Sequence, residues 1–188
     1  MKILFVDTTT ADLVVAILDE NGTTNFSERD VGTHHSEKLC QKVQQALDQH
    51  GASFADLDAY ACAIGPGSFT GIRIGVSTVK GYAMAHPKPF VAVNTLHAIA
   101  NSANCGKRGK AVIDAGNGWY FADLANGVEP CLVAYDDART VDAGKCQGGL
   151  GYLDGSLHLV EQKFASGQFD QTLTPLYIRR SQAEENKK

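Results

Sequence analysis

Two short stretches carry residue types that could bind a phosphate group. The first is DTTT, in which Asp7, Thr8, Thr9 and Thr10 follow an apolar run. A carboxylate at a strand end can hold a metal-bound water, and the hydroxyls and N–H groups of such a turn can bind phosphate. Asp114 ends a similar run and would be its counterpart. The alternative is structural, because Asp and Thr side chains favour turns by bonding the nearby backbone.

The second stretch is GPGSFTGIRIG, residues 65–75. It lacks the lysine of a P-loop and the spacing of a dinucleotide-binding G-x-G-x-x-G. Ser68 predicts the N-cap of a helix, and Ser68 and Thr70 could contact an anion at that helix N-terminus. Gly71 and Gly75 lie one turn apart in the same helix, where each glycine costs roughly 1 kcal/mol relative to alanine. A close approach by another backbone would explain them.

The predicted helix, residues 69–85, has an apolar stripe for the core and a second face of mostly small residues. That second face consists of Gly71, Ile74, Gly75, Thr78 and Tyr82. Because small residues let a second helix come close, we interpret this face as a partner or dimer interface. The alternative is close packing inside the chain, on the helix expected at residues 36–50. If the face is an interface, Gly75→Leu leaves the fold intact and weakens association.

Bulk composition excludes several classes of protein. The chain has 188 residues, 44% hydrophobic and 20% charged, which is typical of a soluble globular protein. A net charge of -4 argues against nucleic-acid binding by this chain alone. Its five scattered cysteines predict reduced thiols in the cytoplasm, and no apolar run is long enough to span a membrane. The six histidines show no zinc-binding spacing, and no G-x-S-x-G motif is present, so we predict neither a metal nor a catalytic centre.

Hydrophobic periodicity predicts an α/β protein. Strands are expected at residues 2–7, 13–18, 23–30, 57–65, 89–93 and 129–135, and helices at 36–50, 69–85, 94–104 and 157–168. In the helix at 36–50, the buried stripe is predicted to consist of Leu39, Val43, Ala46, Leu47 and His50. The chain is expected to close with an extended segment and a frayed charged tail.

Residues 111–127 repeat the pattern of residues 4–22. Each segment has an apolar strand ending in aspartate, a polar turn, a second apolar strand and a closing Asn-Gly. Chance similarity is the alternative to a duplication. A duplication predicts two lobes of like topology, residues 1–106 and residues 107–188, each opening with a β-hairpin.

Four motifs resemble the TsaB (YeaZ) family of the actin-like ATPase and glycoprotease superfamily. ILFVDTTT resembles the family's I-D-T-S-T opening, HSEKL its helix start, and PLYIRRSQAE its closing segment, while GPGSFTGIRIGVSTVKG nearly matches its hallmark. The resemblance covers the N-terminal lobe and the C-terminus. It implies an actin-like (ASKHA, ribonuclease H-like) fold, with two lobes of mixed sheet flanked by helices and the second lobe shortened.

The resemblance also implies an accessory role in making threonylcarbamoyladenosine in tRNA. Such a chain pairs with a TsaD-like transferase that modifies the adenosine next to the anticodon of ANN-decoding tRNAs, and a TsaE-like ATPase joins the assembly. The family forms homodimers through N-terminal helices that include residues 69–85. Contact with tRNA is indirect, and no cofactor is implied beyond ATP or ADP at the interface of the complex.

Two alternatives stay open beside this accessory role. In one, the chain is itself an actin-like ATPase or kinase that uses Asp7, Thr8 to Thr10 and Asp114. In the accessory role, the same residues would be the remains of a nucleotide or phosphate site. The other is a glycoprotease-like peptidase, which the missing metal ligands disfavour. The sequence departs from the family where Gly116 replaces an expected arginine after Asp114 and Ala115, and in its short second lobe.

Overall fold

A five-stranded mixed sheet forms the centre of the protein. The computed structural model describes residues 1–32, 34–103, 110–116, 119–123, 130–134, 144–145 and 148–178. The strand order is β3-β2-β1-β4-β5, with β1 (Lys2–Asp7), β2 (Val14–Asp19), β3 (Gly22–Asn25), β4 (Ala59–Gly65) and β5 (Phe90–Asn94). β1 pairs antiparallel with β2 and parallel with β4, and β4 pairs parallel with β5.

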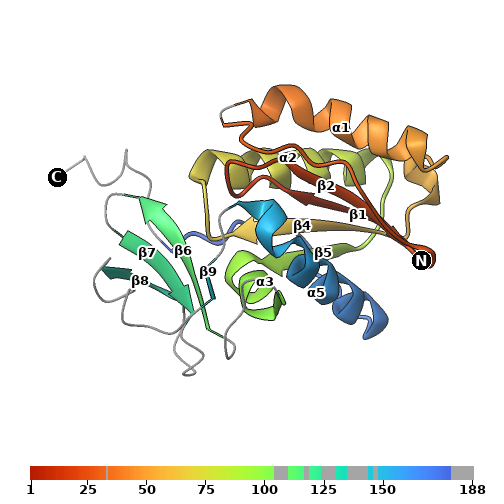
Figure 1. The fold of residues 1–188 in the computed structure, drawn as a ribbon. Coiled ribbons are helices and arrows are strands. Elements are labelled where there is room, and N and C mark those ends of the chain that lie inside the picture. Colours follow the sequence, from red (N-terminus) through yellow and green to blue (C-terminus); the bar gives the residue numbers. More distant parts are fainter. Residues whose placement is uncertain are drawn as a thin grey trace.

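Helices cover both faces of this sheet (Figure 1). α1 (His35–Gln49) and α2 (Phe69–Ala85) lie on one face, and α3 (Thr95–Asn101) and α5 (Leu153–Ala165) on the other, while a short turn of helix, η1 (Phe54–Asp56), precedes β4. Side chains of β1 alternate between two cores: Phe5 packs on the α3/α5 side and Leu4 on the α1/α2 side. A strand buried on both faces needs a continuous apolar run, which is what the sequence ILFV provides.

Most of the predicted elements of the first half are confirmed. In α1, Leu39, Val43, Ala46 and Leu47 are buried, and in α2 the Ser68 side chain accepts the Gly71 N–H at 3.1 Å as an N-cap. His50 was wrongly assigned to the buried stripe. It is the C-cap of α1, half-buried, and its Nε2 lies 2.8 Å from a carboxylate oxygen of Asp19.

The strand expected at residues 23–30 is shorter than predicted. β3 spans Gly22–Asn25 and is exposed throughout. Beyond it, the Phe26 N–H still donates to the Val15 carbonyl of β2 at 2.8 Å, and the pairing ends in an isolated bridge between Leu13 and Glu28. A polar edge segment has no core to hold it in register, so the alternating pattern of residues 23–30 predicted a longer strand than the one that forms.

A second sheet has the order β8-β7-β6-β9, with β6 (Ala111–Gly116), β7 (Trp119–Asp123), β8 (Cys131–Ala134) and β9 (Gly144–Lys145). The predicted second hairpin is confirmed, because β6 pairs antiparallel with β7 as β1 does with β2. β6 also pairs parallel with β9, as β1 does with β4. The two sheets therefore share their local topology.

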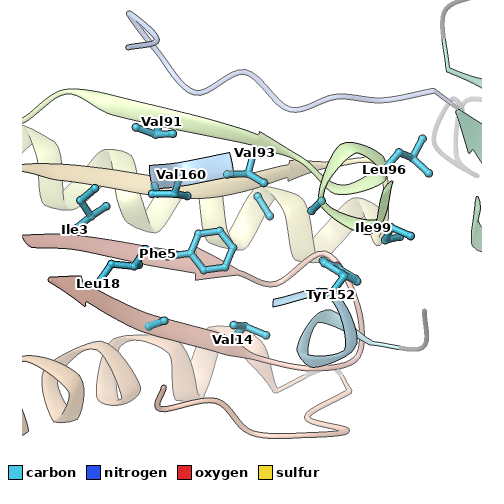
Figure 2. Packing of buried hydrophobic residues seen from close by; sticks show 14 of the residues in the cluster. Ile3, Phe5, Val14, Leu18, Val91, Val93, Leu96, Ile99, Tyr152 and Val160 are labelled. Atoms are coloured by element: carbon cyan, nitrogen blue, oxygen red, sulfur yellow. The ribbon is translucent and has the colours of Figure 1, made fainter. Parts of the chain in front are cut away.

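The chain then returns to the first sheet through the turn η2 (Gly149–Tyr152) and α5. Tyr152 and Val160 pack in the same core as Ile3 and Phe5 (Figure 2). The predicted division at residues 106 and 107 therefore does not follow the packing, because residues 148–178 do not stay with the second sheet. α5 also begins four residues earlier than the helix expected at 157–168. The tail predicted to fray begins at residue 179 and lies outside the described residues.

No helix in the described part of the chain is long and apolar enough to cross a membrane.

Candidate functional site at the β1–β2 turn

The turn after β1 is buried and bonded to the start of α2. Asp7, Thr8 and Thr9 are each 1% exposed. The Thr8 hydroxyl donates to the Gly71 carbonyl at 2.7 Å, and the Ser68 N–H donates to the Thr9 carbonyl at 2.7 Å. The turn therefore lies where the carboxyl ends of the parallel strands β1 and β4 meet, the usual place for a ligand site in an α/β sheet.

Both oxygens of the Asp7 carboxylate have partners within the chain. The Thr9 N–H donates to Oδ1 at 2.7 Å, and the Tyr152 hydroxyl donates to Oδ2 at 3.0 Å. The Thr9 hydroxyl lies 3.2 Å from the same Tyr152 oxygen. An aspartate, a threonine and a tyrosine 145 residues away thus form one buried polar network.

Burial decides the protonation chemistry of this network. It raises the pKa of Asp7, and hydrogen bonds from Thr9 and Tyr152 offset only part of that effect. Burial, together with the nearby Asp7 charge, raises the pKa of Tyr152 well above its ordinary value. Tyr152 therefore keeps its proton and acts as the donor, as a buried carboxylate requires.

A short segment of the chain lies directly against the turn. The Gly149 N–H donates to the Thr10 hydroxyl at 2.8 Å, and the Leu150 N–H donates to the Asp12 carboxylate at 3.2 Å. Gly148 has a φ of +79°, and a Cβ there would lie 2.2 Å from an Asp12 oxygen, so only glycine fits. We call residues 148–152 the latch, because together they hydrogen-bond the Asp7 and Asp12 carboxylates and the Thr10 hydroxyl of the turn.

The glycines of α2 face this turn. A Cβ on Gly71 would lie 1.9 Å from the Thr8 carbonyl oxygen, and one on Gly75 would lie 2.5 Å from the Thr8 hydroxyl oxygen. Both glycines are buried. The close approach inferred from the sequence is real, but the approaching group is Thr8 of the same chain, with its backbone carbonyl at Gly71 and its hydroxyl at Gly75. The interpretation of Gly71 and Gly75 as partner-facing residues is corrected accordingly.

The other three residues of that predicted face are partly exposed. Ile74, Thr78 and Tyr82 are neither fully buried nor open, and the Tyr82 ring packs on Phe54 with centroids 4.6 Å apart. Met84, farther along α2, is 86% exposed. An interface role for Ile74, Thr78 and Tyr82 therefore stays a prediction.

Three further residues that the sequence suggested for a site are placed differently from Asp7. Asp114 lies in β6 of the second sheet, opposite Tyr120, and is exposed. The Ser68 hydroxyl already accepts a helix N–H, while Thr70 is exposed. Among the residues that the structure describes, no group of three His, Cys, Asp or Glu side chains is arranged to hold a metal ion.

Sequence reasoning missed the latch and two residues beneath the turn. Asp12 is 6% exposed and its side chain binds the latch, while His35 is 4% exposed with Nε2 3.1 Å from the Asp12 carbonyl oxygen. The available signal was the doublet Gly148-Gly149 before an aromatic residue, a pattern that permits close backbone approach.

Asp7→Asn is expected to change how stability depends on pH. Because the pKa of Asp7 is raised on folding, its contribution to stability is fully present below its ordinary pKa of about 3.9 and is lost as pH rises through the folded value. Asparagine does not ionise, so the variant gains stability relative to the parent as pH rises. Urea unfolding from pH 3.5 to 8 measures this difference.

The difference between the parent and the Asp7→Asn variant reports the contribution of Asp7 alone to the pH dependence of stability. The pKa values of Asp19, Glu28 and Asp56 are lowered by hydrogen bonds, so these groups give the opposite trend, equally in both proteins. A parent and an Asp7→Asn variant whose free energies of unfolding run parallel with pH would contradict the buried network.

The protein has the actin-like α/β fold, as does YeaZ from Pseudomonas aeruginosa. That structure matches with a TM-score of 0.78 at 24% identity, covering 94% of this chain and 99% of the other. A family model for TsaD, the tRNA N6-adenosine threonylcarbamoyltransferase, matches residues 28–138. The chain belongs to the TsaD family and, within it, to the TsaB (YeaZ) group.

Individual relatives agree with this assignment. The chain is 37% identical over 118 residues to the tRNA threonylcarbamoyladenosine biosynthesis protein TsaB of Escherichia coli K12, covering 61% of this chain and 51% of that protein. The TsaB of Haemophilus influenzae is 31% identical over 103 residues, covering 55% and 43%. A tRNA N6-adenosine threonylcarbamoyltransferase of Methylocapsa acidiphila is 44% identical over 69 residues, covering 37% and 20%. The match spans about half the length of the curated TsaB relatives.

Proposed function

We propose that this chain is a non-catalytic subunit that binds a TsaD-like transferase and supports threonylcarbamoylation of the adenosine next to the tRNA anticodon. The observation that carries the proposal is the latch. The Asp7 carboxylate and the hydroxyls of Thr8 and Thr10 are hydrogen-bonded within the chain. A kinase or ATPase would need those groups free for phosphate and metal.

The partner surface in this proposal is the outward side of α2. Thr78 and Tyr82 lie there, and the strongly exposed Met84 extends the apolar area toward the C-terminal end of the helix. A transferase subunit or a second copy of the chain would use the same surface. A TsaE-like ATPase, indirect contact with tRNA, ATP or ADP at the interface of the complex and a cytoplasmic location complete the proposal.

Reconstitution tests the proposed role. The chain is combined with the TsaD-like and TsaE-like proteins of its source, unmodified tRNA, ATP and the threonylcarbamoyl donor, and the modified adenosine is measured by mass spectrometry. Thr78→Arg is expected to lower the yield at least tenfold without changing the melting temperature, because a long charged side chain would separate the subunits.

Gln162→Arg is the matched control, since Gln162 is exposed on α5 at the opposite face of the sheet. Its yield should equal that of the parent. Full yield with Thr78→Arg would contradict the proposed partner surface. Full yield in a reaction that lacks this chain would contradict the proposed accessory role.

A further inference from the structure

The outer edge of the first sheet is closed by an isolated bridge at Asp170 and by two charged side chains, and not by a full strand. β5 is the last strand on this side, so the backbone groups of Phe90 and Ala92 point away from β4. The Asp170 N–H donates to the Phe90 carbonyl at 2.9 Å, and the Asp170 carboxylate accepts the Ala92 N–H at 2.7 Å. The Lys163 ammonium donates to the Ala92 carbonyl at 2.8 Å.

These two residues reach the edge from different elements. Lys163 lies in the last turn of α5, and Asp170 lies in the segment that follows it. Their charged groups are 3.8 Å apart, and the side chains are 33% and 36% exposed. Farther along the segment, Leu173 is fully buried and holds the chain against the sheet.

An ordinary surface ion pair would not explain this geometry. Pairs at such exposure contribute little to stability, with a median of about 0–1 kcal/mol. Here the acceptor and the donor are directed at one residue's N–H and C=O, the two groups that a neighbouring strand would bind. The pair thus takes the hydrogen-bonding positions of a missing strand.

An uncapped edge of this composition would be a site of association. The sequence of β5 is FVAVN, apolar and rich in β-branched residues, and an open edge strand is a template for pairing with another chain. We infer that Lys163 and Asp170 form an edge clip that prevents β5 from pairing with a strand of a second copy of this chain. The clip thereby restricts self-association to other surfaces of the protein.

The clip is tested by removing both side chains. The double variant Lys163→Met/Asp170→Ala is expected to form species at least twice the mass of the parent's own oligomer at about 100 μM, measured by light scattering after size exclusion. Asp170→Asn keeps an acceptor for the Ala92 N–H and is expected to behave as the parent. Glu28→Ala/Lys38→Met is the control, because it removes a similarly exposed ion pair, and the Lys42–Glu28 pair with it, without changing any side chain that bonds β5.

Hydrogen exchange tests the side-chain bond to the edge strand separately from association. In Asp170→Ala, the Ala92 amide is expected to exchange at least tenfold faster than in the parent, while the Val91 and Val93 amides, which face β4, keep their rates. An unchanged Ala92 rate would overturn the clip. So would a folded double variant that keeps the parent's mass, or equal association of the Glu28→Ala/Lys38→Met control.

Discussion

Gly71→Ala is expected to lower the free energy of unfolding by about 3 kcal/mol. The added methyl group would lie 1.9 Å from the Thr8 carbonyl oxygen, which is backbone and cannot rotate away. The Thr8 hydroxyl also donates to the Gly71 carbonyl, so the helix cannot move outward without breaking that bond. Urea denaturation followed by circular dichroism measures the loss. A Cβ on Gly75 would lie 2.5 Å from the Thr8 hydroxyl oxygen, so Gly75→Leu is also expected to damage the fold, contrary to the expectation from sequence.

Gly81 provides a control in the same helix. It is exposed, and a Cβ there would meet nothing within 4 Å. Gly81→Ala should therefore gain stability, by up to about 1 kcal/mol, from helix propensity alone. Similar effects of the two substitutions, or a Gly71→Ala protein as stable as the parent, would show that the turn does not pack on α2.

Tyr152→Ala is expected to lower the free energy of unfolding by about 4 kcal/mol, within the range for removing a buried aromatic ring. Tyr152 is fully buried between α3, α5 and the first sheet. Its loss leaves a cavity and also removes the donor to the Asp7 carboxylate. Chemical denaturation at pH 7 measures the effect.

Tyr152→Phe separates the hydroxyl from the ring. It keeps the packing but leaves a buried carboxylate oxygen without its donor, which costs about 2 kcal/mol for a bond to a charged group. Tyr60→Phe is the control: that ring is also buried, but its hydroxyl donates at 3.3 Å to the His86 carbonyl in a part-buried position, so the cost should be smaller. Equal costs would mean that the Asp7–Tyr152 bond contributes nothing specific.

Much of the fold was predictable because periodicity reports burial directly. The run ILFV and the apolar stripe of residues 69–85 each describe an element that packs on a core, and the strand and the helix are found at the predicted places. In α2, Ile72, Val76 and Val79 are buried, while Phe69 and Ala83 at the ends of the stripe are only partly buried. Element ends and polar edges were less predictable. The exposed residues of β3 and the capping position of His50 are decided by neighbours that the local pattern does not contain.

The site was predicted only in part, for a physical reason. Sequence shows that Gly71 and Gly75 permit a close approach, but a partner helix and the chain's own Thr8 leave the same signature. Asp7 was found because it ends a strand, yet its partner Tyr152 is far away in a glycine-rich stretch that gives no periodic signal. Only the return of the chain to the first sheet brings the two together.

Titration of the isolated chain with Mg-ATP tests most directly whether the β1–β2 turn is closed by the latch. The amide resonances of Thr9 and Gly149 are followed by NMR while ATP turnover is measured in the same sample. The account predicts that neither resonance shifts and that no ATP is hydrolysed. Saturable shifts of both amides, with turnover abolished by Asp7→Asn, would contradict it and establish the chain as an actin-like ATPase.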